Sequence, residues 1–256
     1  MDTLTLHKLA EMSGGVPDGD VSLEVSRVVT DSRSVTPGEL FVALRGEHFD
    51  GHAFLGDVFA KGVRTAVVEA SCSVAPMGMS LIRVPDTLEA LQKLASEYRR
   101  TLAVLVVGIT GSSGKTTTKD FTFSILSQRM SGWCTAGNLN NHIGVPLTLL
   151  AGSRDCEMAV IEMGMNHAGE IAPLAAMAQP EVGIITNIGM AHIEFLGSQQ
   201  AIAVEKGALA AAISASGTVV LPATETFGKV IEDMTSARIL RAGLSCGDVQ
   251  AVDVHA

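Results

Sequence analysis

Apolar and polar positions along the first hundred residues form short blocks that predict an alternation of strands and helices. Apolar stretches bounded by turn residues such as Pro37 and Gly38 predict strands. Leu88, Leu91 and Leu94 recur at helical spacing and predict a long helix after the last of these strands. The predicted strands cover residues 21–30, 40–44, 65–69 and 80–84. We therefore predict a small α/β domain over residues 1–101.

The remainder of the chain, residues 102–256, repeats strand and helix in a regular order. It opens with an unbroken apolar run from Leu102 to Val107, which is long enough for a buried strand and leads through a glycine-rich loop into a helical pattern. Such alternation favours a mainly parallel sheet with helices on its faces. Further strands are predicted at 157–163, 181–188, 217–221 and 238–240. The predicted fold class is therefore α/β, with a P-loop ATPase-like second domain.

Composition narrows the class of protein without identifying a function. Of the 256 residues, 47% are hydrophobic and 18% are charged, which is typical of a well-buried globular protein and not of a disordered one. The formal net charge of −9 argues against a general nucleic-acid surface or an acidic membrane surface as a partner. An anionic ligand must therefore be held by a local site.

Cysteine usage and the first residues indicate where the protein works. The four cysteines are widely scattered, lack the paired spacing of a metal site and fit a reducing cytosol. The N-terminal residues are too polar for a signal peptide, and no apolar run approaches the ~20 residues of a membrane span. We expect a cytoplasmic monomer with no membrane span and no nucleic-acid partner.

The loop after the first strand of the second domain carries the clearest chemical signal. Its small residues let successive backbone N–H groups point inward, and the positive end of the following helix adds to their attraction for an anion. Lys115 can then reach the terminal phosphates of ATP, and the Thr116 hydroxyl can ligate Mg²⁺. The general pattern would place a glycine at Ile109, and an ordinary Gly/Ser-rich turn is the alternative. The predicted phosphate-binding residues are Gly111, Ser112, Ser113, Gly114, Lys115, Thr116 and Thr117.

Two further strand ends carry residues that suit a metal. Ligands of an open parallel sheet gather beyond the carboxyl ends of its strands, where Glu162 and His192 are predicted to lie. Alone, Glu162 would be an ordinary solvated carboxylate and His192 an ordinary hydrogen-bonded histidine. Beside a Gly-Lys-Thr loop, they can together supply oxygen and nitrogen ligands for a divalent cation around a triphosphate.

Other polar residues are open to two interpretations. Lys206 lies on a predicted helix and would ordinarily be a surface lysine. Ser32 and Arg33 belong to a turn, although Arg33 also offers a forked donor to a phosphate or a pyrimidine edge. Three amides crowd into four positions and fit either a bland turn or a polar ligand contact. These amides are Asn138, Asn140 and Asn141.

Taken together, these motifs resemble the Mur ligases of peptidoglycan synthesis. One motif is similar to the family's phosphate loop, including its glycine placement. A second set resembles the uridine-nucleotide domain that the last two ligases of the pathway share, and a third set favours the dipeptide-adding ligase over the one before it. The motif similar to the phosphate loop is 110–117. The set that resembles the uridine-nucleotide domain comprises 31–33, 41–47 and 50–52. The set that favours the dipeptide-adding ligase comprises 137–141, 143–146 and 189–192.

The resemblance implies ATP-driven amide formation. A substrate carboxylate attacks the γ-phosphate to give an acyl phosphate and ADP, and an amine then displaces the phosphate. For the dipeptide-adding member, the substrates are UDP-N-acetylmuramoyl-tripeptide and D-alanyl-D-alanine. By resemblance, Lys115 and the loop amides hold the β- and γ-phosphates, while Thr116, Glu162 and His192 ligate Mg²⁺. The implied substrate-binding residues are Ser32, Arg33, Asn138, Asn140 and Asn141.

Lys206 matches the carbamylated lysine of this family, which reverses the surface interpretation. Addition of CO₂ to a neutral amine turns a cation into an anionic oxygen ligand, and burial that disfavours the ammonium form makes this addition feasible. The resemblance therefore implies that Lys206 is a further metal-binding residue. The implied catalytic residues are Lys115, Glu162, His192 and Lys206.

The chain departs from the family at its end. Family members have a third domain, and their central sheet continues beyond the position of Ala256. The segment 221–226 also lacks the Asn-Ala-Asp-Asp pattern expected after its strand. We therefore expect an incomplete central domain, and an isolated chain that binds substrate yet turns over poorly or not at all. Two alternatives stay open: the preceding ligase, which adds an amino acid to UDP-N-acetylmuramoyl-dipeptide, and a non-catalytic nucleotide- or UDP-sugar-binding module.

Overall fold

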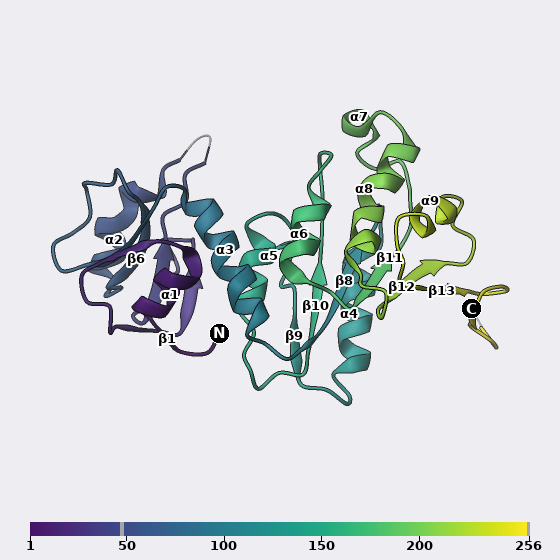
Figure 1. Cartoon of the computed structure of the whole chain (residues 1–256), viewed down its shortest axis with the longest axis horizontal. Coiled ribbons are helices and arrows are strands. Elements are labelled where there is room, and N and C mark those ends of the chain that lie inside the picture. Colours follow the sequence, from purple (N-terminus) through teal and green to yellow (C-terminus); the bar gives the residue numbers. More distant parts are fainter. Residues whose placement is uncertain (47–48, 255–256) are drawn as a thin grey trace. The chain divides into compact units, whose positions relative to one another are not determined.

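The computed structural model describes residues 1–46 and 49–254, which divide into two compact units (Figure 1). Unit 1 comprises Met1–Leu102 and Leu149–Arg154, and unit 2 comprises the other described residues. The segment 149–154 joins unit 1, where its Gly152 carbonyl accepts a hydrogen bond from the Tyr98 hydroxyl at 3.0 Å. The sequence pattern places this segment in the second domain, because no local feature reveals a partner 54 residues away.

Unit 1 is built on a five-stranded sheet in the order β2-β7-β6-β5-β4. The four neighbours β4 (Arg27–Val29), β5 (Glu39–Val42), β6 (Thr65–Glu69) and β7 (Ser80–Val84) run parallel, and β2 (Val16–Asp18) is antiparallel to β7. A separate two-stranded sheet joins β1 (Leu4–Thr5) to β3 (Glu24–Val25). The strand expected over 21–30 is therefore two short strands, because the chain changes pairing partner between Val25 and Arg27.

The helices of unit 1 cover this sheet and close its core. They are α1 (Leu6–Ser13), the 3-10 helix η1 (Gly51–Phe54), α2 (Leu55–Ala60) and α3 (Thr87–Arg100). The Asp86 carboxylate caps α3 by accepting a hydrogen bond from the backbone N–H of Glu89 at 2.8 Å. Buried Phe41 and Val68 of the sheet pack with Leu55 of α2 in one apolar cluster. The end of β5 is thereby fixed close to η1 and α2.

Unit 2 is built on a seven-stranded sheet in the order β14-β13-β12-β11-β8-β10-β9, with every pairing parallel. The strands are β8 (Leu105–Thr110), β9 (Gly132–Cys134), β10 (Met158–Glu162), β11 (Val182–Ile185), β12 (Thr218–Pro222), β13 (Arg238–Gly243) and β14 (Val249–Gln250). From β8 the chain goes to the edge strand β9, returns to insert β10 between β9 and β8, and then adds β11 on the other side of β8. The strand order thus reverses at β8, and ligands of such sheets bind at this reversal point.

Helices lie on both faces of the unit 2 sheet. They are α4 (Lys115–Leu126), α5 (Gly144–Leu149), α6 (Ile171–Ala178), α7 (Ile193–Leu196), α8 (Gln199–Ala212) and α9 (Gly228–Glu232). Val107 and Ile109 of β8 pack in one cluster with Phe123 of α4. Gly108, which points to the other face, lies against Leu209 of α8. α4 and α8 therefore cover opposite faces, and both reach the central strand.

The structure confirms the predicted α/β class and the parallel sheet of the second domain, and it finds strands over 65–69 and 80–84 as predicted. It adds β1, β2, β9 and β14, each only two or three residues long. Such short strands carry no readable periodicity and depend on their neighbours for pairing. Glu47, part of one family-like motif, lies outside the described residues. None of the helices described here is both long and apolar enough to cross a lipid bilayer.

Candidate functional site

The glycine-rich loop of unit 2 connects the central strand β8 to α4. Gly111 has φ +153°, and a Cβ atom there would lie 1.8 Å from the Thr186 hydroxyl oxygen. Only glycine therefore lets the loop pass so close to the chain that leaves β11. Gly114, with φ +75°, then turns the chain into α4 and has open space around its Cα.

Side-chain hydrogen bonds fasten the loop to the segment after β11. The Asn187 side-chain oxygen accepts from the backbone N–H groups of Ser112 and Ser113 at 3.1 and 3.0 Å. The Asn187 amide donates to the Ser113 hydroxyl at 2.6 Å, and the Ser112 hydroxyl accepts from the Gly189 N–H at 2.8 Å. Asn187 thus shapes the loop, although the sequence motif alone gave no sign of this role.

The N-terminus of α4 is open to an anion. Gly114 supplies no side-chain cap, so the first N–H groups of this twelve-residue helix keep their positive potential. The Lys115 ammonium donates to the Gly111 carbonyl oxygen at 2.9 Å and is only half-buried. Thr116 and Thr117 are exposed beside it. A phosphate group is the ligand that suits this combination of backbone donors and one lysine.

Two buried oxygen atoms lie without a partner at the neighbouring strand ends. They are Glu162 Oε2 and Thr110 Oγ1, and they are the only such side-chain atoms among residues 1–46 and 49–254. Glu162 is only 2% exposed and pairs with Ile109 in the strand register, while Thr110 pairs with Ile185 of β11. A buried carboxylate oxygen with no donor is costly, so each atom marks a place where a ligand can contribute a contact.

The other oxygen of Glu162 is held firmly. Glu162 Oε1 accepts from the Asn140 amide at 2.8 Å, and the Glu162 backbone N–H donates to the Thr135 hydroxyl at 2.8 Å. Buried Lys119 of α4 donates to the Thr135 carbonyl at 3.0 Å, and the Gly164 N–H donates to the Asn140 carbonyl at 2.8 Å. These residues fix the carboxylate and leave Oε2 open. Lys119 and Thr135 are site residues that the sequence motifs missed, because their contacts join distant parts of the chain.

The remaining predicted residues of unit 2 differ in whether their side chains form hydrogen bonds within the protein. Asn141 accepts from the backbone N–H groups of Ile143 and Gly144 at 3.1 and 2.9 Å and so starts α5. Asn138 is exposed. His192 is half-buried and adopts a left-handed conformation, with φ +65°. In the part of the chain that the structure describes, its ring forms no hydrogen bond with another residue, so its nitrogens are accessible to a ligand.

Lys206 is buried within α8, contrary to the ordinary expectation for a lysine on a helix. It is 2% exposed, and burial, with a smaller contribution from Lys115, lowers the pKa of Lys206 to about 8, while Glu205 acts in the opposite direction. The Glu205 carboxylate accepts from the backbone N–H groups of Gly169 and Ile171 at 2.7 and 2.8 Å. α8 is thereby fastened to the start of α6, and Lys206 presents an amine that readily loses its proton.

A divalent cation fits the open oxygen of Glu162. Among the described residues, no group of three or more His, Cys, Asp or Glu side chains forms a self-sufficient metal site. Mg²⁺ usually keeps several waters and binds through one or two carboxylates together with substrate phosphates, so a single orphaned carboxylate oxygen beside a phosphate loop is what such a site requires. The residues present are therefore compatible with a cation that arrives with the nucleotide.

Unit 1 contains a separate pocket of about 470 Å³ beside the turn after β4. Ser32 and Arg33 line it, together with the Phe49 and Phe54 rings, which are 57% and 40% exposed. Such exposed rings suit stacking on a planar base. Neither ring belongs to the residues chosen from sequence, although a phenylalanine in an otherwise polar loop is a signal that can be read.

The predicted arginine of this pocket is already paired. Arg33 Nη2 and Nε donate to Asp31 at 2.8 and 2.9 Å, and this contact lowers the pKa of Asp31 to about 2. The Lys61 ammonium donates to the carbonyl oxygens of Ser32 and Arg33 at 2.8 and 2.9 Å. The turn is therefore held in shape, and the Arg33 guanidinium keeps further N–H donors for a ligand.

Comparison with known families and proteins places these features in context. The profile of the Mur ligase middle domain matches residues 109–255, and that of the Mur ligase family, catalytic domain, matches residues 24–99. The UDP-N-acetylmuramoyl-tripeptide--D-alanyl-D-alanine ligase of Bacillus subtilis is 43% identical over 205 residues, which are 79% of this chain and 45% of the relative. The Escherichia coli ligase of the same name is 40% identical, over 87% of this chain and 48% of the relative.

Solved structures give the same result. A crystal structure of MurF from Acinetobacter baumannii matches 100% of this chain and 56% of its own, with a TM-score of 0.92 and 35% identity. The MurF ligase from Thermotoga maritima in complex with ADP matches 87% of this chain and 51% of its own, with a TM-score of 0.77 and 32% identity. The chain thus spans about half the length of the curated relatives it matches.

Proposed function

Because the chain belongs to the Mur ligase family, we propose that it carries the nucleotide-binding parts of a ligase that joins D-alanyl-D-alanine to UDP-N-acetylmuramoyl-tripeptide. Unit 1 takes the uridine nucleotide in the pocket beside Ser32, and unit 2 takes ATP at the loop before α4. The observation that carries the proposal is the buried Glu162 carboxylate, whose Oε2 is left open beside a phosphate-binding loop.

The residues of unit 2 have distinct roles in this proposal. The open N–H groups of α4 receive the phosphates, and the Lys115 ammonium leaves the Gly111 carbonyl to contact them. Glu162, Thr116 and His192 would hold Mg²⁺, which supplies charge neutralisation during phosphoryl transfer. The substrate carboxylate then attacks the γ-phosphorus and gives an acyl phosphate and ADP. The amine of the dipeptide attacks the acyl carbon, forms the amide bond and releases phosphate.

Lys206 acts in this proposal after reaction with CO₂. Its amine, whose pKa is lowered to about 8, is partly neutral at physiological pH, and the nitrogen lone pair forms a bond to the carbon of CO₂ while one proton is released. The resulting carbamate is an anion with two oxygen atoms. It would serve as a further ligand for Mg²⁺, and its negative charge would balance part of the charge of the cation.

Phosphate release from ATP tests the proposed reaction. The assay compares UDP-N-acetylmuramoyl-tripeptide with and without D-alanyl-D-alanine, in this chain and in the full-length product of its gene. We expect release that depends on both substrates in the full-length protein, and a loss of two to three orders of magnitude in Lys115→Met. Lys229→Met, which removes an exposed lysine of α9, serves as the matched control.

Two results would replace the proposal with an alternative. Release that requires UDP-N-acetylmuramoyl-dipeptide and a free amino acid would identify the preceding ligase of the pathway. If no substrate pair releases phosphate while the UDP-tripeptide still binds, the protein is a non-catalytic binding module.

A further inference from the structure

Arg45 and Gly46 pair with Asp50 and Phe49 as the base of a small hairpin, and Phe49 of this base lines the 470 Å³ pocket of unit 1. The base is an isolated antiparallel bridge between Arg45 and Asp50, and the Gly46 N–H donates to the Phe49 carbonyl at 2.9 Å. Gly51 follows, where a Cβ atom would lie 2.7 Å from the Leu44 carbonyl oxygen, so the hairpin lies directly against the end of β5. Phe49 and Gly51 both line the pocket, and the shape of the pocket depends on what holds this hairpin.

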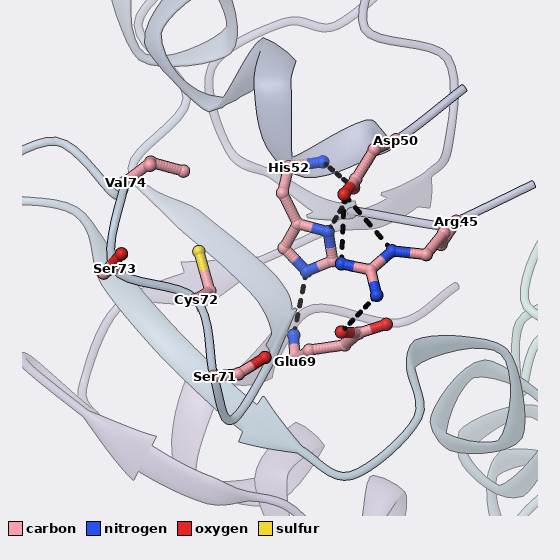
Figure 2. Close-up of a pocket in the computed structure, with 8 residues that line it drawn as sticks. All are labelled: Arg45, Asp50, His52, Glu69, Ser71, Cys72, Ser73 and Val74. Atoms are coloured by element: carbon pink, nitrogen blue, oxygen red, sulfur yellow. Dashed lines mark hydrogen bonds and ion pairs between the residues drawn. The ribbon is translucent and has the colours of Figure 1, made fainter. Parts of the chain in front are cut away.

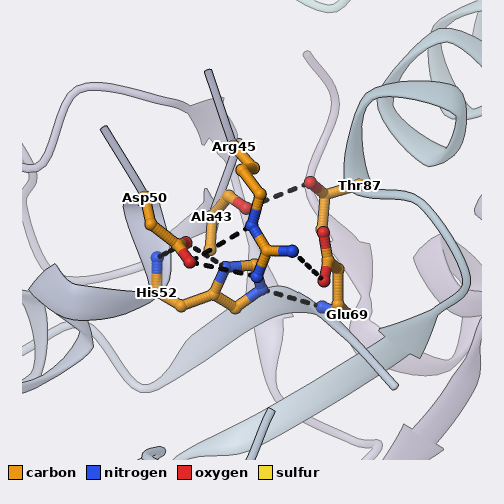
Figure 3. A network of polar contacts seen from close by, with 6 residues as sticks. All are labelled: Ala43, Arg45, Asp50, His52, Glu69 and Thr87. Carbon is orange, nitrogen blue, oxygen red and sulfur yellow. Dashed lines mark hydrogen bonds and ion pairs between the residues drawn. The ribbon is translucent and has the colours of Figure 1, made fainter. Parts of the chain in front are cut away.

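Asp50 collects the donors at the base of the hairpin (Figure 3). Its Oδ2 accepts from Arg45 Nε and Nη2 at 3.2 and 3.0 Å, and its Oδ1 accepts from the His52 backbone N–H at 3.0 Å. The same Oδ1 lies 2.6 Å from His52 Nδ1. Burial pushes the pKa of Asp50 upward, but the hydrogen bonds from His52 and Arg45 outweigh this effect and hold it below its usual value. Asp50 is therefore an ionised acceptor.

The second ring nitrogen of His52 fixes where the proton lies. His52 Nε2 is 2.9 Å from the backbone N–H of Glu69 at the end of β6, and a backbone N–H can only donate. Nε2 must therefore carry a lone pair, so the ring proton is on Nδ1, where it donates to Asp50 Oδ1. The ring is buried, with 7% of its side chain exposed, and both nitrogens are used. His52 is thus unavailable as a general base.

From this geometry, we propose that His52 is a positioning residue for the nucleotide pocket of unit 1, acting as a neutral imidazole with its proton on Nδ1. Through one ring, it ties the base of the hairpin to the end of β6 and so fixes the pocket wall that Phe49 and Gly51 form. The proposal rests on the uridine-nucleotide pocket of the previous section. It adds a residue that acts on the ligand through the hairpin and without touching it.

The charged groups around His52 support a bracing role over a binding role. Arg45 joins Asp50 to Glu69, with its Nη1 3.1 Å from Glu69 Oε2, so both carboxylates that face the ring already have a cationic partner. Figure 2 shows the cavity that these side chains border, which has a volume of about 180 Å³. Ligand pockets usually measure roughly 300–1,000 Å³, so this cavity is too small for a nucleotide. The network therefore serves the larger pocket, which Phe49 and Gly51 line.

Nuclear magnetic resonance of the intact chain tests the placement of the proton without any ligand. With ¹⁵N-labelled histidine, we expect His52 to show a protonated Nδ1 and an unprotonated Nε2. We also expect the Glu69 amide to exchange slowly with solvent in the unaltered chain and quickly in His52→Ala, while amides inside β6, at Ala66 to Val68, stay protected in both. A proton on Nε2, or a Glu69 amide that exchanges at the same rate in both proteins, overturns the proposal.

Binding of UDP to the variants tests the effect on the pocket. Gln at position 52 can offer an acceptor near the place of Nε2, so we expect His52→Gln to keep most of the affinity for UDP. His52→Ala removes both hydrogen bonds, and we expect UDP to bind about tenfold more weakly. His7→Ala removes an exposed histidine of α1 and is the matched control, with unchanged binding expected.

The outcomes separate this proposal from the proposed function. If His52→Ala binds UDP as tightly as the unaltered chain, the positioning role is wrong. If His52→Ala fails to fold, the position of the ring proton and the His52→Gln variant still test the proposal. A His52→Gln protein that folds but binds UDP about tenfold more weakly than the unaltered chain contradicts the acceptor role. If the unaltered chain does not bind UDP, the nucleotide assignment of the pocket fails, and the resonance measurements alone then judge His52.

Discussion

Both units hold polar side chains in or beside their cores, but in the described part of the chain only unit 2 leaves buried side-chain oxygen atoms without a partner. In unit 1, the donors and acceptors of Asp50 and His52 meet one another, the Arg45 guanidinium or the backbone. In unit 2, Glu162 Oε2 and Thr110 Oγ1 have no partner, and they are the only such buried side-chain atoms in the described part of the chain. A paired network holds a loop in place. A buried group without a partner has lost its hydration without a compensating hydrogen bond, and a ligand that supplies the bond recovers this free energy.

This difference separates residues that build a site from residues that bind a ligand. Removing a member of a paired network should weaken the fold, because its partner is left unsatisfied. Removing an open group should cost the unliganded fold little and should cost the reaction much. The four experiments that follow measure both quantities, and each can contradict the distinction. The single tryptophan, Trp133, lies in unit 2, and the single tyrosine, Tyr98, lies in unit 1, so fluorescence can follow the two units separately.

The largest effect is expected for Glu162→Gln. The amide side chain can still accept from Asn140 at the position of Oε1, but it no longer offers a charged oxygen to a cation. In the full-length gene product, we expect phosphate release from ATP to fall by two to three orders of magnitude. The unfolding midpoint of unit 2, followed by Trp133 fluorescence, should stay unchanged or rise, because an unpaired buried charge is removed.

Glu157→Gln is the control for this experiment. Glu157 lies just before the same strand, is exposed, and accepts from the Ser131 backbone N–H at 2.9 Å. We expect its replacement to leave phosphate release within a factor of about two. A Glu162→Gln protein that keeps its activity, or one that loses stability instead of activity, would show that Glu162 belongs to the framework.

Sequence motifs identified the loop and the open groups better than the framework around them. Lys115 and Glu162 stand in recognisable local patterns, one after a glycine-rich turn and the other at the end of an apolar strand. The hydrogen bond from Asn140 to Glu162 spans 22 residues, and the one from Ser113 to Asn187 spans 74. Such pairs are created by the order of the strands in the sheet, which a single sequence does not reveal.

The same limit applies to the fold. The strands β6 and β7 are apolar runs with clear ends, so their bounds can be read directly. β9 has only three residues, Gly132–Cys134, and is a strand because β10 lies beside it. The burial of Lys206 is likewise not readable from its local sequence. Its burial depends on the packing of α8 against the sheet, which outweighs the usual preference of lysine for the surface.

The second prediction compares two glycines of the phosphate loop. Gly111→Ala would place a methyl group on the Thr186 hydroxyl, and we expect it to destabilise unit 2 by about 3 kcal/mol. Gly114→Ala meets no atom within 4 Å and carries only the conformational cost of φ +75°, about 1 kcal/mol. Urea unfolding followed at Trp133 measures both. Equal losses at the two positions would mean that the contact with Thr186 does not shape the loop.

The third prediction concerns pH and Lys206. Its pKa in the folded chain is about 8, below the usual 10.5, so between these values the unfolded chain holds the proton and the folded chain does not. The burial cost is therefore fully present below pH 8 and is relieved as the pH rises toward 10.5. In CO₂-free buffer, we expect Lys206→Met to be more stable than the unaltered chain at pH 7.5, on the order of 2 kcal/mol, and the gap to narrow by pH 10.

Lys229→Met is again the control, because Lys229 is exposed. The difference in unfolding free energy between Lys229→Met and the unaltered chain should not narrow with rising pH. Repeating the pH series with dissolved CO₂ adds a second comparison, since a carbamylated Lys206 no longer titrates as an amine in this range. A Lys206→Met gap that is constant from pH 7.5 to 10 would contradict the burial of an ammonium group at this position. The proposal of a reactive amine would then lose its physical basis.

The smallest effect, and the most direct test of the contrast between the units, comes from two threonines. Thr110 and Thr87 are both buried, but the Thr87 hydroxyl donates to the Ala43 carbonyl at 3.0 Å, whereas the Thr110 hydroxyl has no partner. Valine has nearly the same shape and lacks the hydroxyl. We expect Thr87→Val to destabilise unit 1 by about 1 kcal/mol, measured at Tyr98, and Thr110→Val to leave unit 2 unchanged or more stable by a similar amount. If both substitutions destabilise equally, the Thr110 hydroxyl has a partner in solution, and the open strand end of unit 2 is as fully paired as the hairpin of unit 1.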